Sequence, residues 1–191
     1  MCPGEFPGGP GTKGVGTLMA IRKIVLLGDP ILRQKAKRVS RFDKSIQQLI
    51  DDMIDTMRDA PGTGLAAPQV GVPLRVAVIE VDEEITVVCN PEIVETEGEY
   101  EPEEGCLSIP GYVANVKRAL KVVVKAKNRR GKDIKIKAED LLAHALQHEI
   151  DHLDGILFID RLPSLDLLRK VPPKPEVEEE AEEERAASTA V

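Results

Sequence analysis

Two histidines separated by three residues, His148 and His152, are the side chains in this chain best suited to metal chemistry. Residues four apart in a helix project from the same face, so both imidazoles can bind one ion. Glu149 directly follows the first histidine, where a carboxylate can move protons on a water that the ion activates. The leucines and alanines from Leu141 to Leu146 favour a helix here. The stretch predicts a metal site, although histidines one turn apart also occur on hydrogen-bonded or solvated helix faces.

A third metal ligand has to come from upstream of these histidines. Beyond His152 there is no further histidine, and the carboxylates before the acidic end of the chain are Asp154, Asp160 and Asp166. The chain therefore lacks the downstream ligand that ordinary HExxH metallopeptidases use. Cys106 stands in a segment constrained by Pro110-Gly111, which can present its sulfur to one point. If Cys106 reaches the helix, one thiolate and two imidazoles leave a fourth position for water, the catalytic arrangement.

The segment 61–71 is a second unusual stretch, in which small apolar residues alternate with glycine and proline. Backbone of this kind lets a ligand or another chain approach closely. The segment is not a phosphate-binding loop, because it lacks the Gly-Lys-Ser/Thr ending. A plain connection from a helix to a strand explains it equally well.

Hydrophobic periodicity predicts the elements that must position these segments. Apolar residues repeat every three or four positions over 46–57, a helix that Ser40 or Asp43 can cap. Residues 75–81 and 85–88 alternate as a hairpin, with Cys89 at its end as a packed core thiol. A long basic hairpin is expected over 116–127 and 133–138, after which Asp140 caps the histidine-bearing helix. Short extended or buried segments are predicted at 24–27 and 156–159.

Composition limits the class of protein. A chain of 191 residues is long enough for one domain with a sizeable core. It has no Trp, two Tyr and three Phe, which argues against aromatic platforms for nucleobases. We therefore expect no stable nucleic-acid binding, although ten Lys and Arg fall between Lys117 and Lys137. The net charge of -7 lies mostly in residues 174–191, which hold seven Glu against one Lys and one Arg.

The two ends of the chain differ in composition from its middle. Residues 1–18 are rich in Gly and Pro and resemble neither a secretory signal nor a transit peptide, so we predict a disordered extension with Met19 as the biological start. Residues 19–170 are expected to form one catalytic domain, and 171–191 an acidic, disordered tail. Three cysteines without disulfide spacing and the lack of an apolar spanning run predict a cytoplasmic protein that contacts no membrane.

Three segments of the chain together resemble the signature motifs of peptide deformylases, in the same order. They are Gly62-Thr63-Gly64-Leu65-Ala66-Ala67-Pro68-Gln69, Glu104-Gly105-Cys106-Leu107-Ser108 and Gln147-His148-Glu149-Ile150-Asp151-His152. The similarity extends over roughly residues 21–161. It implies an α+β fold in which antiparallel or mixed sheets surround a central metal-binding helix, with a second helix towards the N-terminus. It also implies hydrolysis of the formyl group from the N-terminal formyl-methionine of nascent polypeptides.

The resemblance assigns the metal chemistry residue by residue. Cys106, His148 and His152 would bind the metal, and Glu149 would serve as general base and acid. It implies one Fe²⁺ per chain, with Zn²⁺ or Ni²⁺ able to substitute, because a thiolate and two imidazoles suit these ions. Ferrous iron bound in this way would be sensitive to oxygen.

The resemblance also assigns the residues that contact substrate. Gln69 and the backbone amide of Leu107 would stabilise the oxyanion of the tetrahedral intermediate. The backbone of the glycine segment and of the cysteine segment would run along the bound peptide, while one face of the helix would border the methionine pocket. These substrate-binding positions are Thr63, Gly64, Gly105, Leu141, His144 and Ala145.

Two features depart from the family pattern. His144 stands where the family generally has an aliphatic or other residue bordering the methionine pocket, and we interpret it as a pocket-wall or hydrogen-bonded histidine rather than a fourth ligand. The C-terminus is acidic, whereas some relatives dock on the ribosome through a basic C-terminal helix. Ribosomal RNA would repel an acidic segment, so we do not expect this mode of docking here. Transient ribosome contact would then fall to the basic hairpin. Glu104 and Arg118 are expected to form an orienting ion pair beside the cysteine.

Two other functions fit parts of the sequence. An HExxH metallopeptidase acting on ordinary amides would give no role to Gln69 or Cys106. An inactive, ribosome-associated metal-binding protein would most readily have lost Glu149 or Gln69, and both are present. The sequence therefore favours the deformylase interpretation over either alternative.

Overall fold

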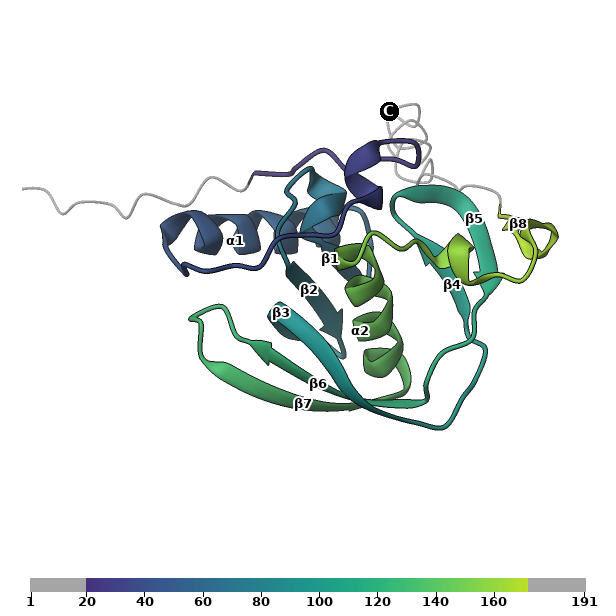
Figure 1. Cartoon of the computed structure of the whole chain (residues 1–191). Helices are drawn as coiled ribbons and strands as arrows, with labels where there is room; N and C mark the ends of the chain where they lie inside the picture. The colour runs from purple at the N-terminus through teal and green to yellow at the C-terminus, as the bar shows by residue number, and fades with distance from the viewer. Residues whose placement is uncertain (1–19, 172–191) are drawn as a thin grey trace, which may run out of the picture.

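Two antiparallel sheets flank a helix in the computed structural model, which describes residues 20–171 (Figure 1). This architecture confirms the predicted α+β class with a central helix. The extension 1–18, the proposed start at Met19 and residues 172–191 of the acidic tail lie outside the described residues. The predicted boundaries of the domain therefore stay predictions.

The larger sheet has the strand order β1-β2-β3-β6-β7, formed by Gly64–Ala66, Val76–Val81, Glu84–Glu97, Lys121–Lys127 and Asp133–Glu139. The smaller sheet has the order β4-β5-β8, formed by Glu103–Cys106, Ile109–Asn115 and Arg169–Lys170. The 3-10 helices of the described part are η1 Pro30–Arg33, η2 Ala67–Val70, η3 Phe158–Arg161 and η4 Leu165–Leu167. Neighbouring strands in both sheets run antiparallel.

Both predicted hairpins are present in the larger sheet. β2 and β3 are joined by Asp82 and Glu83, whose positive φ of 51° and 64° suits a two-residue hairpin turn. Cys89 is fully buried as expected, and burial raises the pKa of its thiol to about 11. β6 and β7 pair along their whole length and turn alternate apolar residues towards the core. The outward residues of this hairpin are largely lysines that pair with acidic neighbours.

The segment predicted as a loop or a plain connection at 61–71 holds two short elements. β1 pairs with β2, and η2 follows it directly. Four consecutive residues of η2 are buried, which anchors the segment against the core. The segment is therefore a fixed wall of the larger sheet rather than a flexible connection.

The helix predicted over 46–57 is α1, Lys44–Asp59. Of the two candidate caps, Asp43 is the one used, because its carboxylate accepts the backbone N–H groups of Ser45 and Ile46. The buried face of α1 includes Leu49, Ile50 and Met53, which pack with residues of β1 and β2. Its methionines are packing residues, as expected.

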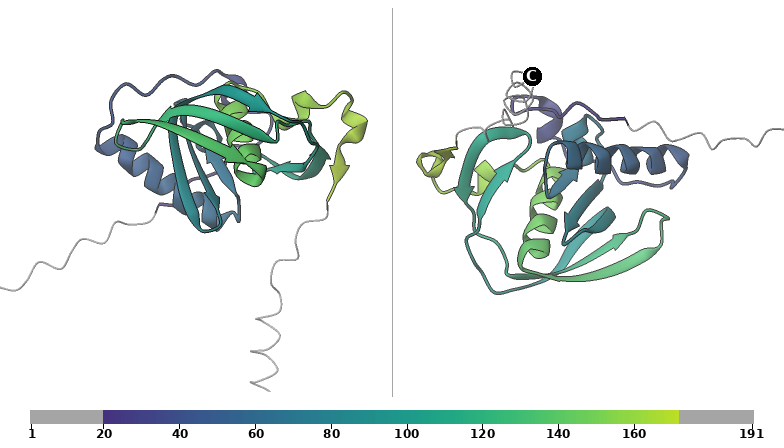
Figure 2. Two further views of the ribbon diagram at one scale, coloured as in Figure 1. Left: turned by 90° about the horizontal axis from the view of Figure 1, so that it is seen from below. Right: turned by 180° about the vertical axis from the view of Figure 1, so that it is seen from behind.

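The central helix α2, Asp140–Leu153, lies between the larger and the smaller sheet (Figure 2). Its apolar side chains pack with those of β2, β3 and β6 in one core cluster. The prediction that Asp140 caps this helix is wrong: Glu139 holds the cap position, and its side chain makes no cap hydrogen bond. The reason is that β7 runs directly into α2, so the Leu120 carbonyl accepts the Asp140 N–H instead.

The two short predicted segments are present, and neither of them forms a strand. Residues 24–26 form an extended segment that belongs to no strand, and Leu27 begins a turn. The N–H groups of Val25 and Leu27 donate to the carbonyls of Gln69 and Ser108, each at 2.8 Å. The buried segment near 156–159 leads into η3. The extended segment therefore bridges η2 and the turn between β4 and β5.

The end of α2 is held by tight backbone contacts. The Leu153 carbonyl accepts hydrogen bonds from the Ala36 N–H at 2.9 Å and the Arg75 guanidinium at 3.2 Å. Gly155 has φ +77°, and a Cβ at this position would lie 2.7 Å from the carbonyl oxygen of Arg33. Only glycine fits here, because both the backbone conformation and the space exclude a side chain.

We therefore predict that Gly155→Ala lowers the free energy of unfolding by roughly 2–4 kcal/mol, since left-handed strain adds to a backbone overlap. Urea unfolding of the two proteins measures this loss. Gly28→Ala is the matched control, because Gly28 also has positive φ but nothing lies within 4 Å of its added Cβ. Equal losses in the two variants would show that the contact with Arg33 has no effect.

Candidate active site

Helix α2 brings His148 and His152 to the end of strand β4. The sulfur of Cys106 lies 3.2 Å from Nε2 of His152, and the rings of His148 and His152 meet edge to face at 4.9 Å. One ligand atom from each of the three residues lies within 4.8 Å of the other two. The structure thus brings together the three residues that the sequence predicts as metal ligands.

The chemistry of these three residues fits a metal ion. A thiolate with two imidazoles is a donor set used by zinc and by other soft or borderline ions. Nδ1 of His148 is bonded to Glu104 at 2.9 Å, which leaves Nε2 of the ring to face an ion. Burial lowers the pKa of His152 well below its usual value, which favours the neutral ring that metal binding requires. Three protein ligands leave room for a water as well.

The ion pair predicted between Glu104 and Arg118 is present and buried. The Arg118 guanidinium contacts both carboxylate oxygens, at 2.5 and 2.9 Å. Nε2 of His144 approaches the same carboxylate at 2.9 Å, opposite the contact from His148. Burial alone would raise the pKa of Glu104, but the hydrogen bonds from Arg118, His144 and His148 outweigh it and lower the pKa well below the usual range. Glu104 is therefore charged and fixes the first histidine ligand.

Two residues that the sequence analysis missed extend this network. Arg118 also donates to Asp151 at 2.6 Å, and Asp151 is in turn paired with Arg161. Asp151 lies on α2 between the two histidines, so its helical position offered a signal. Arg161, on η3, offered none, because only the fold brings it to the helix.

Glu149 lies deep in the site beside Gly64. Burial raises the pKa of Glu149 to about 7, although the neighbouring His148 opposes the rise. Oε2 of this carboxylate is buried and has no hydrogen-bond partner within residues 20–171. An added Cβ at Gly64 would overlap the carboxylate, so this glycine is needed to accommodate Glu149. Its carboxylate can therefore exchange a proton near neutral pH.

The carboxamide of Gln69 is fixed at both ends. Its oxygen accepts the Ala66 N–H at 2.8 Å, and its nitrogen lies 3.6 Å from the Cys106 sulfur and 3.2 Å from the Ser108 hydroxyl. Leu107 follows Cys106 in the turn between β4 and β5, so its backbone amide is close to the same point. Ser108 belongs to the second motif, but its contact with Gln69 could not be foreseen from the sequence.

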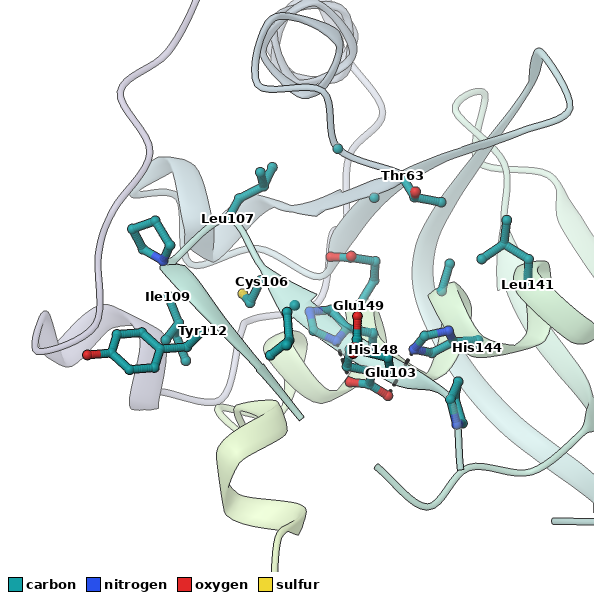
Figure 3. A pocket seen from close by; sticks show the side chains of 18 of the residues that line it. Thr63, Glu103, Cys106, Leu107, Ile109, Tyr112, Leu141, His144, His148 and Glu149 are labelled. Carbon is teal, nitrogen blue, oxygen red and sulfur yellow. Dashed lines mark hydrogen bonds and ion pairs between the residues drawn. The ribbon is translucent and has the colours of Figure 1, made fainter. Parts of the chain in front are cut away.

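A cleft of about 750 Å³ opens over these residues. In Figure 3, Cys106, His148 and Glu149 face one another, while Leu141 and His144 lie towards one end of the cleft and Ile109 and Tyr112 towards the other. Of the predicted site residues, the cleft is lined by Thr63, Gly64, Gln69, Gly105, Cys106, Leu107, Leu141, His144, Ala145, His148 and Glu149. The remaining one, His152, is buried beneath them.

A profile of the polypeptide deformylase family matches residues 21–167. The chain belongs to this family. It is 53% identical over 167 residues to the peptide deformylase of Dehalococcoides mccartyi strain CBDB1, covering 86% of this chain and all of that protein. The peptide deformylase of Heliobacterium modesticaldum is 56% identical over 144 residues, 75% of this chain and 95% of the relative.

Solved structures show the same fold. The crystal structure of a Legionella pneumophila peptide deformylase superimposes with a TM-score of 0.75 at 48% identity, covering 90% of this chain and 99% of the other. The Acinetobacter baumannii enzyme with bound Met-Ala-Ser gives 0.74 at 33% identity, covering 76% of this chain and 100% of the other.

Family membership establishes the reaction. The chain is a metal-dependent hydrolase that removes the N-formyl group from nascent formyl-methionyl polypeptides. Neither the ordinary metallopeptidase nor the inactive metal-binding protein is favoured by these relationships. Within residues 20–171, no helix has the length and apolarity needed to span a membrane.

We predict that His144→Ala leaves the metal content unchanged, because Arg118 still holds both oxygens of Glu104. Metal analysis of the purified variant after dialysis tests this. His148→Ala, one helical turn further along, is the positive control and should lose the metal. Loss of metal from the His144 variant would show instead that this histidine has a direct part in holding the ion.

Proposed function

We propose that the metal is ferrous iron, held by Cys106, His148 and His152, with Zn²⁺ or Ni²⁺ able to replace it. The proposal is supported by the convergence of one sulfur and two imidazole nitrogens within 4.8 Å of one another. Such an ion would act as a Lewis acid and would lower the pKa of the attacking water towards neutrality. The thiolate makes the iron form sensitive to oxygen.

Glu149 is proposed as the group that moves the proton. Its carboxylate would accept a proton from the attacking water and return it to the amine that leaves. The raised pKa of about 7 supports this role, because a group near neutrality can both take and release a proton at the working pH. The unpartnered Oε2 leaves one carboxylate oxygen available.

Gln69 and the backbone amide of Leu107 are proposed as the donors to the oxyanion that forms from the formyl oxygen. The carboxamide nitrogen of Gln69 points to the sulfur of Cys106, at 3.6 Å, and therefore faces the point where the three ligands converge. Donors fixed before the reaction stabilise developing charge without reorganisation, and each is worth roughly 10²–10³ in rate.

The proposed peptide path follows the cleft. Thr63 and Gly64 form one wall and Gly105 the other, while Leu141, His144 and Ala145 of α2 border the pocket for the methionine side chain. The Acinetobacter baumannii structure with bound Met-Ala-Ser supports a tripeptide ligand for a cleft of this fold. Nascent chains are made in the cytoplasm, where the free thiols of Cys89 and Cys106 persist, so we propose that location as well.

The first test is formate release from formyl-Met-Ala-Ser by the anaerobic, ferrous protein. We expect rapid release by the wild type and a loss of roughly 10²–10⁴-fold in Glu149→Gln, with the metal retained, because the glutamine cannot transfer the proton. Air exposure should lower the wild-type rate if the active ion is iron. If the variant stays fully active, Glu149 has no proton-transfer role; if the metal-loaded wild type releases no formate, the catalytic assignment fails.

The same assay on Gly64→Ala tests whether activity depends on the position of the Glu149 carboxylate. The added Cβ would displace Glu149, so activity should fall while the metal remains. Gly28→Ala is the control, because Gly28 does not line the cleft and nothing lies within 4 Å of its added Cβ.

Transient ribosome contact is proposed for the β6–β7 hairpin. Most of its outward lysines are paired, but Lys125 and Lys137 have no ion pair within residues 20–171. Unpaired lysines on a sheet face can meet RNA phosphates. This surface is the alternative to docking through a basic C-terminal helix.

Co-sedimentation of the protein with the ribosomes of the cytosolic fraction, measured at rising salt concentration, tests both the contact through the hairpin and the proposed cytoplasmic location. The variant Lys125→Gln/Lys137→Gln should co-sediment less than the wild type at low salt. Lys121→Gln, whose lysine is already paired with Glu139, is the control. Identical binding of all three proteins would exclude the hairpin as the contact surface.

A further inference from the structure

The side chain of Ser108 lies behind the Gln69 carboxamide. Its hydroxyl oxygen is 3.2 Å from Nε2 of Gln69, and both residues are almost completely buried. The contact with Gln69 is the only hydrogen bond that the Ser108 side chain makes among residues 20–171. Because Gln69 is its one hydrogen-bond partner among these residues, the Ser108 hydroxyl can influence the site through the position of the Gln69 side chain.

A glutamine carboxamide has two ends and can rotate about its terminal torsion. The Ala66 N–H donates to the oxygen at 2.8 Å, which settles that the nitrogen is the end facing Cys106 and Ser108. This one bond still allows the amide plane to turn, because terminal torsions of this kind are broad. The Ser108 oxygen gives the nitrogen a second fixed point and so sets the plane.

The backbones of both residues are held independently of the hydroxyl. The N–H groups of Val25 and Leu27 donate to the carbonyls of Gln69 and Ser108, each at 2.8 Å. Cys106 and Ile109 are paired on either side of the turn that contains Ser108. Removal of the hydroxyl would therefore free the Gln69 side chain without releasing the turn.

We propose that Ser108 is a positioning residue that holds the Gln69 carboxamide in the orientation needed to donate to the oxyanion. The inference rests on the proposed function of Gln69 as an oxyanion donor. One N–H of the amide is occupied by the serine, so the other is directed to the space beside the Cys106 sulfur. A donor that is aligned before the reaction stabilises the oxyanion more than one that must turn towards it.

A double-mutant cycle on formate release tests the proposal, with the full chain loaded anaerobically with ferrous iron. We expect Gln69→Ala to lower kcat/KM by roughly 10²–10³-fold. Ser108→Ala should lower it by roughly tenfold, mainly through kcat, because one orienting hydrogen bond is lost. In the Gln69→Ala background, Ser108→Ala should have no further effect, since the side chain on which it acts is absent.

Controls separate this role from a purely structural one. Thr56 on α1 has a hydroxyl as buried as that of Ser108, bonded to Arg22 and Asp52 away from the cleft. Thr56→Val should lower stability and leave kcat unchanged, and metal content is measured for every variant. Metal loss in Ser108→Ala would place its effect on Cys106 and overturn the proposal.

Two kinetic outcomes would also overturn it. An equal effect of Ser108→Ala with and without Gln69 would show that the serine acts through another group, and full activity of Ser108→Ala would show that it has no effect. Full activity of Gln69→Ala is a different result, because it would remove the proposed oxyanion role of Gln69 itself.

Discussion

The buried charge of Glu104 is the constraint on which the site depends. Its carboxylate receives the guanidinium of Arg118 and the rings of His144 and His148, so one residue of β4 fixes the smaller sheet against α2. Loss of the Arg118 guanidinium would leave an uncompensated charge inside the protein, which typically costs roughly 3–5 kcal/mol. The carboxylate of Asp151 forms a further ion pair with the guanidinium of Arg118. The proposed metal ligands on β4 and α2 thus keep one relative position.

Small residues make the rest of this geometry possible. Gly64 leaves the space that the Glu149 carboxylate fills, and the alanines of α2 let the helix lie close to the sheets. The turn of Leu107 and Ser108 directly follows Cys106, so the next backbone amide lies beside the sulfur. The proposed catalytic side chains therefore lie on elements whose positions are set by packing, beneath a cleft that is open in this structure.

The sequence predicts the parts of this site that are local. Helical spacing is enough to place His148 and His152 on one face, and the motif order is enough to include Cys106 and Gln69. Contacts between distant segments carry no such signal: Arg161 reaches Asp151, and Ser108 reaches Gln69, only because separate elements meet. The error at Asp140 has the same origin, since a strand that continues directly into a helix leaves no room for an ordinary cap.

The extended segment at Val25 and Leu27 has a consequence for the order in which the chain matures. It is among the earliest-made of the described residues, yet its hydrogen-bond partners, Gln69 and Ser108, are made much later. The two histidine ligands are made later still, near the end of the described chain. A growing chain of this protein therefore cannot hold its ion until α2 has left the ribosome. The site of each new copy therefore comes together only after the whole segment from Val25 to His152 has been made.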